Sequence, residues 1–203
     1  MDKKYKSLFV WGAIILVVIV VAAWFVSTRN GFVTLSEGVD SQWSEVENQY
    51  QRRLDLIPNL VETVKGYAAH EENTYENVTR ARAGLQSAYD EANALQTADI
   101  ADAPQIDAAQ QQLGRALSIY VNAVREAYPD LKADTQFTNL QTQLEGTENR
   151  IATARGRYIE QVREYNVAIR RFPASMIASM SGFLPKEQFK AQEGAATAPK
   201  VSF

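Results

Sequence analysis

The chain has 203 residues, no cysteine, a single histidine and a formal net charge of −3. The absence of cysteine excludes disulfides, thiolate metal sites and a cysteine nucleophile, and one histidine is a poor basis for a transition-metal site. The first seven residues contribute +2, so the rest carries −5 and lacks the basic cluster that nucleic acid or anionic lipid requires as a main partner. Abundant Ala, Gln, Glu, Leu and Arg, with little Gly or Pro, favours helix.

An uncharged apolar run of 19 residues occupies positions 8–26. As a helix it spans about 28 Å, close to the ~30 Å hydrocarbon thickness of a bilayer, and Trp11 and Trp24 lie near its two ends. A cleaved signal peptide with a cleavage site at 21–23 is the alternative, but the apolar run continues beyond that site. We therefore expect an uncleaved transmembrane helix, with residues 1–7 in the cytoplasm because three lysines precede the span.

Beyond a junction at 27–35 that contains Asn30-Gly31, apolar residues recur at steps of three and four, the spacing of helices with one buried face. The four stripes are Val39, Trp43, Val46, Tyr50, Leu54, Ile57, Val61 and Val64; Tyr75, Val78, Leu85, Tyr89, Ala92 and Leu95; Ile106, Leu113, Leu117, Tyr120 and Val124; and Phe137, Leu140, Leu144, Ile151, Tyr158, Val162, Tyr165, Ile169 and Phe172. A turn at 99–104 separates the second stripe from the third.

This pattern predicts an all-α fold: a single N-terminal transmembrane helix, then an elongated antiparallel four-helix bundle over 36–172 with coiled-coil-like packing. Tyr128-Pro129-Asp130 closes the third helix, and the fourth is expected from Asp130 to Arg171. Residues 173–203 then form an amphipathic segment and tail. No strand-like alternation competes with this interpretation.

The stretch from Arg52 to Glu71, R-R-L-D-L-I-P-N-L-V-E-T-V-K-G-Y-A-A-H-E, is amphipathic on both sides of a proline. Together with Val39-Asp40 and Trp43, with 131–152 and with 165–173 (Y-N-V-A-I-R-R-F-P), it resembles the LemA family of bacterial membrane proteins; G-F-L-P-K-E-Q-F and P-K-V-S-F also fit. The resemblance implies one membrane helix and an antiparallel bundle, with no established enzymatic activity. The junction N-G-F-V-T-L-S-E-G-V-D departs from the family pattern, which leaves open whether anchor and first helix are continuous.

Pro58 lies inside the first predicted bundle helix, where it deprives the carbonyl of Leu54 of its usual donor. One interpretation is a tolerated kink that lets a long helix wrap the bundle. The other is a hinge or partner-binding notch around Asp55, Pro58 and Asn59.

Arg53 and Arg82 fall at or beside core positions when the stripes are extended. A buried guanidinium needs a carboxylate partner to offset its desolvation, and Glu145 and Glu148 lie at the edge of the fourth stripe. We hypothesise a buried ionic network that fixes the bundle register and joins one or both arginines to one of these glutamates. The alternative is that the arginines extend their charged ends into solvent.

The remaining candidates lie between helices and near the end of the sequence. His70-Glu71 resembles the start of a zinc-protease motif, but Thr74 occupies the second histidine position, so we expect no metal or cofactor. The segment Met176, Ile177, Met180, Phe183 and Leu184 packs on the bundle or touches the bilayer surface. Val201 and Phe203 present two apolar side chains and are candidates for capture by strand addition in a PDZ-like groove.

Together these features predict a non-enzymatic scaffold or adaptor in the bacterial cytoplasmic membrane, with its bundle on the outer, periplasmic side. It would act through protein–protein contacts and self-association into a homo-oligomer, because an anchor raises the effective concentration of its copies. A membrane-remodelling bundle and an adaptor for a membrane protease are the alternatives. No nucleic acid partner is expected.

Overall fold

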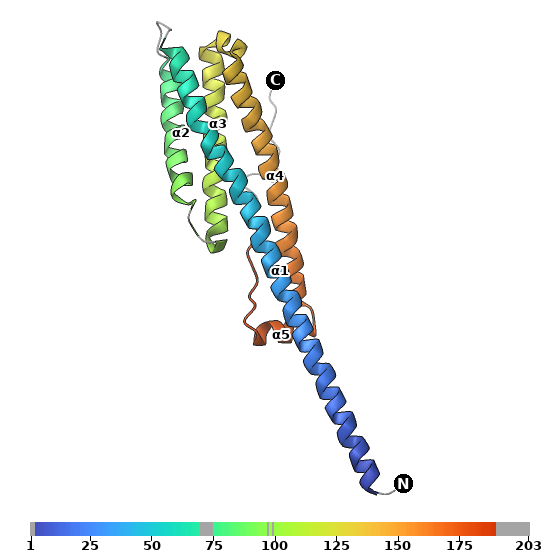
Figure 1. The fold of residues 1–203 in the computed structure, drawn as a ribbon. Coiled ribbons are helices and arrows are strands. Elements are labelled where there is room, and N and C mark those ends of the chain that lie inside the picture. The colour runs from blue at the N-terminus through green and yellow to red at the C-terminus, as the bar shows by residue number, and fades with distance from the viewer. Residues whose placement is uncertain (1–2, 70–74, 97, 99, 190–203) are drawn as a thin grey trace, which may run out of the picture. The chain divides into compact units, whose positions relative to one another are not determined.

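The structure, a computed structural model, describes residues 3–69, 75–96, 98 and 100–189. Over these residues it contains helices and no strand, so the predicted all-α fold is confirmed (Figure 1). In chain order the α-helices are α1 (Lys3–Ala68), α2 (Glu76–Ala94), α3 (Ala103–Ala127), α4 (Thr135–Arg170) and α5 (Ala174–Met180). Two short 3-10 helices, η1 (Ile100–Asp102) and η2 (Pro129–Ala133), precede α3 and α4.

The chain divides into two compact units, and α1 and α4 each contribute to both. The first unit contains Met1–Ser41 and Glu160–Lys186, and the second contains Gln42–Ile159 and Glu187–Phe203. The first therefore holds the apolar part of α1, the end of α4 and α5. The second holds the remainder of α1 with α2, α3 and most of α4.

Helix α1 is 66 residues long and begins with the apolar run identified in the sequence. An 18-residue window within it has a mean hydropathy of 2.8 and is entirely unburied, so the helix is long and apolar enough to cross a membrane. It continues without a break through 27–35, so the expected junction is itself helical. Asn30 and Gly31 lower helix propensity by only about 1 kcal/mol or less each, which the flanking helical runs outweigh.

In the first unit, the end of α4 and α5 pack beside α1. Phe32 of α1 contacts Phe183, with ring centroids 5.4 Å apart. Other buried side chains of this unit are Val39, Val162, Tyr165, Ile169, Ile177 and Ala178. The predicted amphipathic segment after residue 173 thus contains a short helix whose Ile177 and Ala178 are buried.

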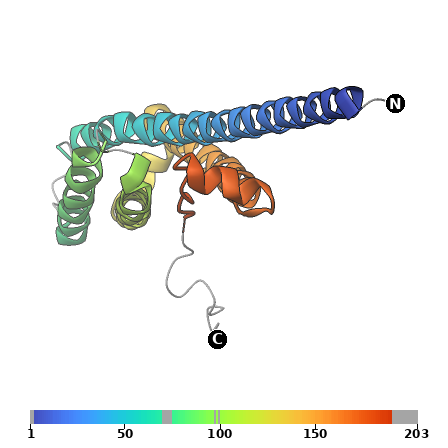
Figure 2. The ribbon, with the colours of Figure 1, turned by 90° about the horizontal axis from the view of Figure 1, so that it is seen from below.

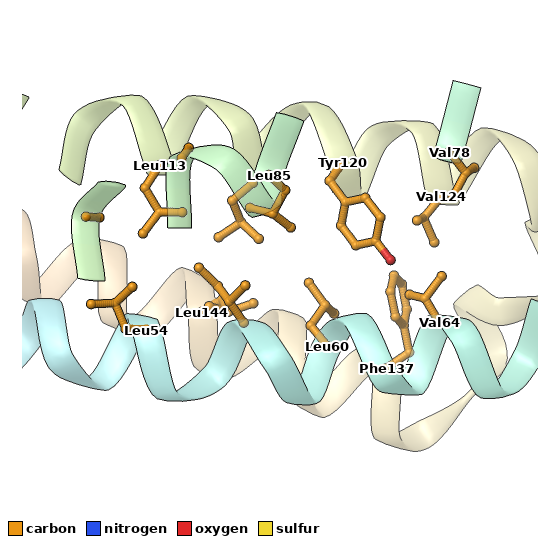
Figure 3. Close-up of a cluster of buried hydrophobic side chains, with 14 of the residues drawn as sticks. Leu54, Leu60, Val64, Val78, Leu85, Leu113, Tyr120, Val124, Phe137 and Leu144 are labelled. Atoms are coloured by element: carbon orange, nitrogen blue, oxygen red, sulfur yellow. The ribbon is translucent and has the colours of Figure 1, made fainter. Parts of the chain in front are cut away.

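In the second unit, one apolar core lies between four helices. Helices α2 and α3 lie side by side, as both views show (Figures 1 and 2). The core side chains that point toward one another in Figure 3 include Leu54, Leu60 and Val64 from α1, Val78 and Leu85 from α2, Leu113, Tyr120 and Val124 from α3, and Phe137 and Leu144 from α4. Helices predicted from separate sequence stripes therefore share one core, as the bundle prediction requires.

Helix α4 starts later than predicted. It begins at Thr135, not at Asp130, because residues 129–133 form the 3-10 helix η2. Asp134 then caps the helix: its Oδ1 accepts a hydrogen bond from the backbone N–H of Phe137 at 2.8 Å. A side-chain acceptor bonded to the third helical N–H is the usual N-cap arrangement, and it fixes the first turn here.

Several positions of the predicted stripes behave differently in the structure. Tyr89, Leu95 and Leu140 are only partly buried, and Tyr75 is exposed. Leu60 is fully buried, whereas its neighbour Val61, the predicted core residue, is only partly buried. Phe172, the predicted last core residue of the fourth stripe, is exposed. That prediction was wrong because α4 ends at Arg170, so Phe172 no longer follows the helical spacing that its position in the stripe assumed.

Candidate functional site: a buried polar cluster

Arg53 is buried in the second unit, next to the core residue Leu54 on α1. Arg53 is only 3% exposed. Nη1 donates to Oε1 of Glu148 on α4 at 2.7 Å, and Nη2 donates to the backbone carbonyl (2.8 Å) and to Oε1 (2.6 Å) of Gln110 on α3. Such charge-assisted hydrogen bonds offset the desolvation of a buried guanidinium.

The space for this guanidinium depends on a glycine of α3. A Cβ atom placed on Gly114 would lie 3.1 Å from Nη1 of Arg53, closer than most real contacts of that kind. Gly114 therefore leaves the room into which Arg53 reaches across from α1. Gly114 lies within the regular helix α3, so glycine is needed here for the space it leaves and not for an unusual backbone conformation.

A second buried charge, Asp107 of α3, lies on the same side of the bundle. Its Oδ1 accepts from the phenol of Tyr50 at 2.7 Å. Its Oδ2 accepts from Nε2 of Gln111 at 2.6 Å and from Nη2 of Arg155 on α4 at 3.0 Å. Both carboxylate oxygens thus have donors, and one of these is a cation, as a buried carboxylate requires.

Tyr50 connects the two halves of the cluster. The guanidinium carbon of Arg53 lies 5.7 Å from the centre of the Tyr50 ring, within cation–π range. Burial raises the pKa of the Tyr50 phenol above its ordinary value, and the negative charge of Asp107 raises it further. The phenol therefore stays protonated and acts as a hydrogen-bond donor throughout the physiological pH range.

The polar cluster, defined here as Tyr50, Arg53, Asp107, Gln110, Glu148 and Arg155, ties α1, α3 and α4 together. Its bonds are directional, so sliding one of these helices by a turn breaks several at once. The cluster therefore holds the three helices in one register relative to each other.

The residues proposed from the sequence are only partly brought together. Arg53 and Glu148 form an ion pair, whereas Glu145 is exposed and Arg82 is exposed on α2. The side of α2 that faces the core carries residues 78, 81, 85, 88 and 92. Arg82 follows residue 81 in the chain, so its side chain points away from that side and lies outside the core. Within the described residues, neither Arg82 nor Glu145 belongs to the cluster.

The other candidates lie elsewhere or outside the described residues. Pro58 is exposed within the unbroken helix α1, and the side chain of Asn59 donates to the carbonyl of Asp55 at 3.2 Å. Whether Pro58 acts as a hinge stays a prediction. His70, Val201 and Phe203 lie outside the described residues.

A model of the LemA family matches residues 42–203. The chain belongs to the LemA family. Two magnetosome proteins of Paramagnetospirillum magneticum, MamQ 1 and MamQ 2, are each 28% identical to it over 190 residues, covering 87% of this chain and 70% of each relative. MamQ of Magnetospirillum gryphiswaldense is 28% identical over 174 residues, 79% of this chain and 64% of that protein. The resemblance inferred from the sequence is thus confirmed.

Sequence reasoning missed several members of the polar cluster in this LemA-family chain. Gln110 occupies a step of the third stripe, between Ile106 and Leu113, where a polar side chain interrupts an apolar row. That interruption is the signal that could have identified it. Arg155 carries the same signal, because it stands four residues after Ile151 and three before Tyr158 in the fourth stripe. Asp107 carries none, because charged residues one position from a stripe are common on exposed helix faces.

The segment after α5 is attached to helices of the first unit by side-chain bonds. The hydroxyl of Tyr165 donates to the carbonyl of Leu184 at 2.9 Å. The amide of Asn166 bonds the backbone of Lys186 twice, donating to its carbonyl at 2.8 Å and accepting from its N–H at 3.0 Å. The ammonium of Lys186 pairs with Asp40 of α1. These contacts fix the backbone that follows α5.

Proposed function

We propose that this LemA-family chain is a membrane-anchored, non-catalytic scaffold that acts through protein–protein contacts and self-association. One observation carries the proposal: an apolar stretch at 8–26, with no buried residue in its most apolar window, lies on the same unbroken helix that supplies Leu54 and Leu60 to the bundle core. Such a stretch is costly in water and stable in a bilayer.

The lysines before the span support an N-terminus in the cytoplasm and a bundle on the outer side of the bacterial cytoplasmic membrane. Lys3, Lys4 and Lys6 precede the apolar run, and only Arg29 follows it closely. The orientation can be measured separately from the scaffold role, by the accessibility of an engineered single cysteine to a membrane-impermeant reagent.

The polar cluster supports a non-catalytic role, because its side chains are used to join helices. Its most buried charges are both bonded to neighbouring helices, Arg53 to Gln110 and Glu148 and Asp107 to Tyr50 and Arg155. Groups that react are usually held beside open space for a substrate, with a hydrogen-bonding capacity left for it. Here that capacity is directed at other helices.

Self-association would follow from confinement to one plane, which raises the effective concentration of copies and makes weak lateral contacts productive. The test uses full-length protein, labelled with donor or acceptor dye at a single introduced cysteine and reconstituted into lipid vesicles. We expect energy transfer that exceeds the value calculated for random crowding and that falls reversibly when empty lipid is added. Transfer equal to the random value at every density would refute the scaffold proposal.

Membrane remodelling is the rival proposal, supported by exposed apolar side chains such as Met176 and Met180 in the unit that contains the anchor. It predicts that the purified protein tubulates or clusters vesicles, whereas a scaffold leaves their shape unchanged. The adaptor proposal, a role in delivering clients to a membrane protease, depends on Val201 and Phe203. It predicts that a peptidase co-purifies and is lost when residues 201–203 are removed.

A further inference from the structure

The corner at which α4 ends and α5 begins has an unusually apolar surface. Phe172, Met176, Met180 and Leu184 are each between 60% and 78% exposed. From residue 172 to residue 185 the chain contains no charged residue, and Arg171 and Lys186 flank this stretch. A contiguous group of large exposed apolar side chains on a water-facing protein marks a contact surface.

This corner lies close to the point where the anchor ends. Gln161 of α4 lies against Gly38 of α1, and the two helices run in opposite directions (Figure 1). The ten residues from Gln161 to Arg171 advance about 15 Å along α1 toward its N-terminus, to within about one turn of Val26. The contact of Phe183 with Phe32 agrees, because Phe32 is six residues, or about 9 Å, beyond Val26.

The apolar side chains are displayed on a fixed backbone. Ile177 and Ala178 on the other side of α5 are buried in the first unit. On its C-terminal side, the backbone is held where Asn166 bonds Lys186. Met176 and Met180 therefore face outward while the same short helix is anchored inward.

We propose that the α4–α5 corner, presenting Phe172, Met176, Met180 and Leu184, inserts into the bilayer interface beside the anchor and forms a second membrane contact. Side chains of this kind, preceded by the exposed Arg170 and Arg171, suit the boundary between headgroups and acyl chains. A second contact would restrict the tilt of the first unit against the membrane. The inference rests on the anchor of the proposed function and is independent of self-association.

A second copy of the chain is the competing occupant of this surface. Lipid is favoured because the corner lies at the level where α1 leaves its apolar run, so bilayer is present there whenever the anchor is inserted. Exposed Arg170 and Arg171 precede the uncharged stretch, as basic residues do at an anionic membrane surface. A protein partner would have to displace that lipid.

The test uses full-length protein, in which a single cysteine can be introduced cleanly because the chain has none. Four variants, Val18→Cys, Met176→Cys, Met180→Cys and Ile119→Cys, are labelled with an environment-sensitive fluorophore. They are reconstituted into vesicles of phosphatidylcholine and phosphatidylglycerol, with or without bromine on the acyl chains. Val18 reports insertion of the anchor, and Ile119, exposed on α3 of the second unit, is the matched apolar control.

We expect brominated lipid to lower the fluorescence at 18, 176 and 180 about twofold or more, since interfacial side chains insert about 5–10 Å, and to leave 119 unchanged. Quenching at 18 without quenching at 176 and 180 would overturn the inference and keep the anchor. No quenching at 18 would overturn the anchor and the inference together. A label at 176 whose emission is blue-shifted but not quenched would indicate a protein neighbour and would overturn the inference. Quenching at 119 equal to that at 176 and 180 would overturn it too, because the contact would then not be specific to the corner.

Discussion

Replacing Arg53 by methionine tests whether the polar cluster holds the bundle together. Arg53→Met keeps an apolar stem of similar length and removes the guanidinium. Three hydrogen bonds are lost, to Oε1 of Glu148 at 2.7 Å and to two oxygens of Gln110 at 2.6 and 2.8 Å. The change thus removes the bonds of Arg53 to α3 and α4, while Tyr50 of α1 still donates to Asp107 of α3.

The size of the effect follows from the exposure of the two partners. Gln110 is 1% exposed, so its amide oxygen would be left without a donor, which costs about 1–3 kcal/mol. The side chain of Glu148 is 44% exposed and can be rehydrated, so it adds less than the 3–5 kcal/mol seen when a fully buried pair is broken. We expect Arg53→Met to lower the free energy of unfolding by about 2–4 kcal/mol.

The measurement is urea unfolding of the full-length protein in detergent micelles, followed by circular dichroism. Arg82→Met is the matched control, because the same side chain is exposed on α2 and its replacement should change stability by less than about 0.5 kcal/mol. Glu148→Gln, which keeps an acceptor, should have an intermediate effect. Equal midpoints for Arg53→Met and Arg82→Met at equal slopes would refute the argument.

Three further predictions concern a glycine, a buried tyrosine and the segment after α5. A Cβ atom at Gly84 would have no neighbour within 4 Å, so Gly84→Ala should stabilise the protein by about 1 kcal/mol through helix propensity. Gly114→Ala should stabilise it less, or destabilise it, because its Cβ would meet Arg53. Urea unfolding compares the two variants, and equal gains in stability would contradict the steric argument. Burial raises the pKa of Tyr120 to about 12. The unfolded chain therefore releases that proton first, at about pH 10, and this tyrosine should lower stability by about 1.4 kcal/mol per pH unit from there to about pH 12. Tyr120→Phe should make the slope shallower by that amount and leave the part due to Tyr50, whose pKa is also raised; an unchanged slope would show that the Tyr120 phenol is not responsible. Asn166→Asp cannot donate to the carbonyl of Lys186, so trypsin should cut after this lysine faster, as mass spectrometry of timed digests would show; an unchanged cleavage rate would indicate that the amide bonds do not hold the segment.

Much of the core could be predicted because burial repeats with the period of the helix. Val39, Val46 and Leu54 are buried as the three-four spacing requires. Helix ends were harder to predict, since they depend on single side chains such as Asp134, whose capping bond delays the start of α4. Phe172 was misplaced for the same reason: spacing continues in the sequence after the helix has ended.

The polar cluster was harder to predict because periodicity registers only apolar residues. Arg53 drew attention because it lies beside Leu54 on an otherwise apolar face, and a buried cation requires a carboxylate. Which carboxylate it would bind, Glu145 or Glu148, depends on the register between α1 and α4, which no single helix specifies. Asp107 was invisible for a related reason, since its partners come from three separate stretches of helix.

The stretches that carry the family resemblance supply both partners of several long-range contacts. Arg53 in the first stretch binds Glu148 in the second, and Lys186 of the C-terminal stretch binds Asp40 and Asn166. These motifs therefore encode how distant segments of the chain are joined. Contacts of this kind specify a fold and do not identify a reaction.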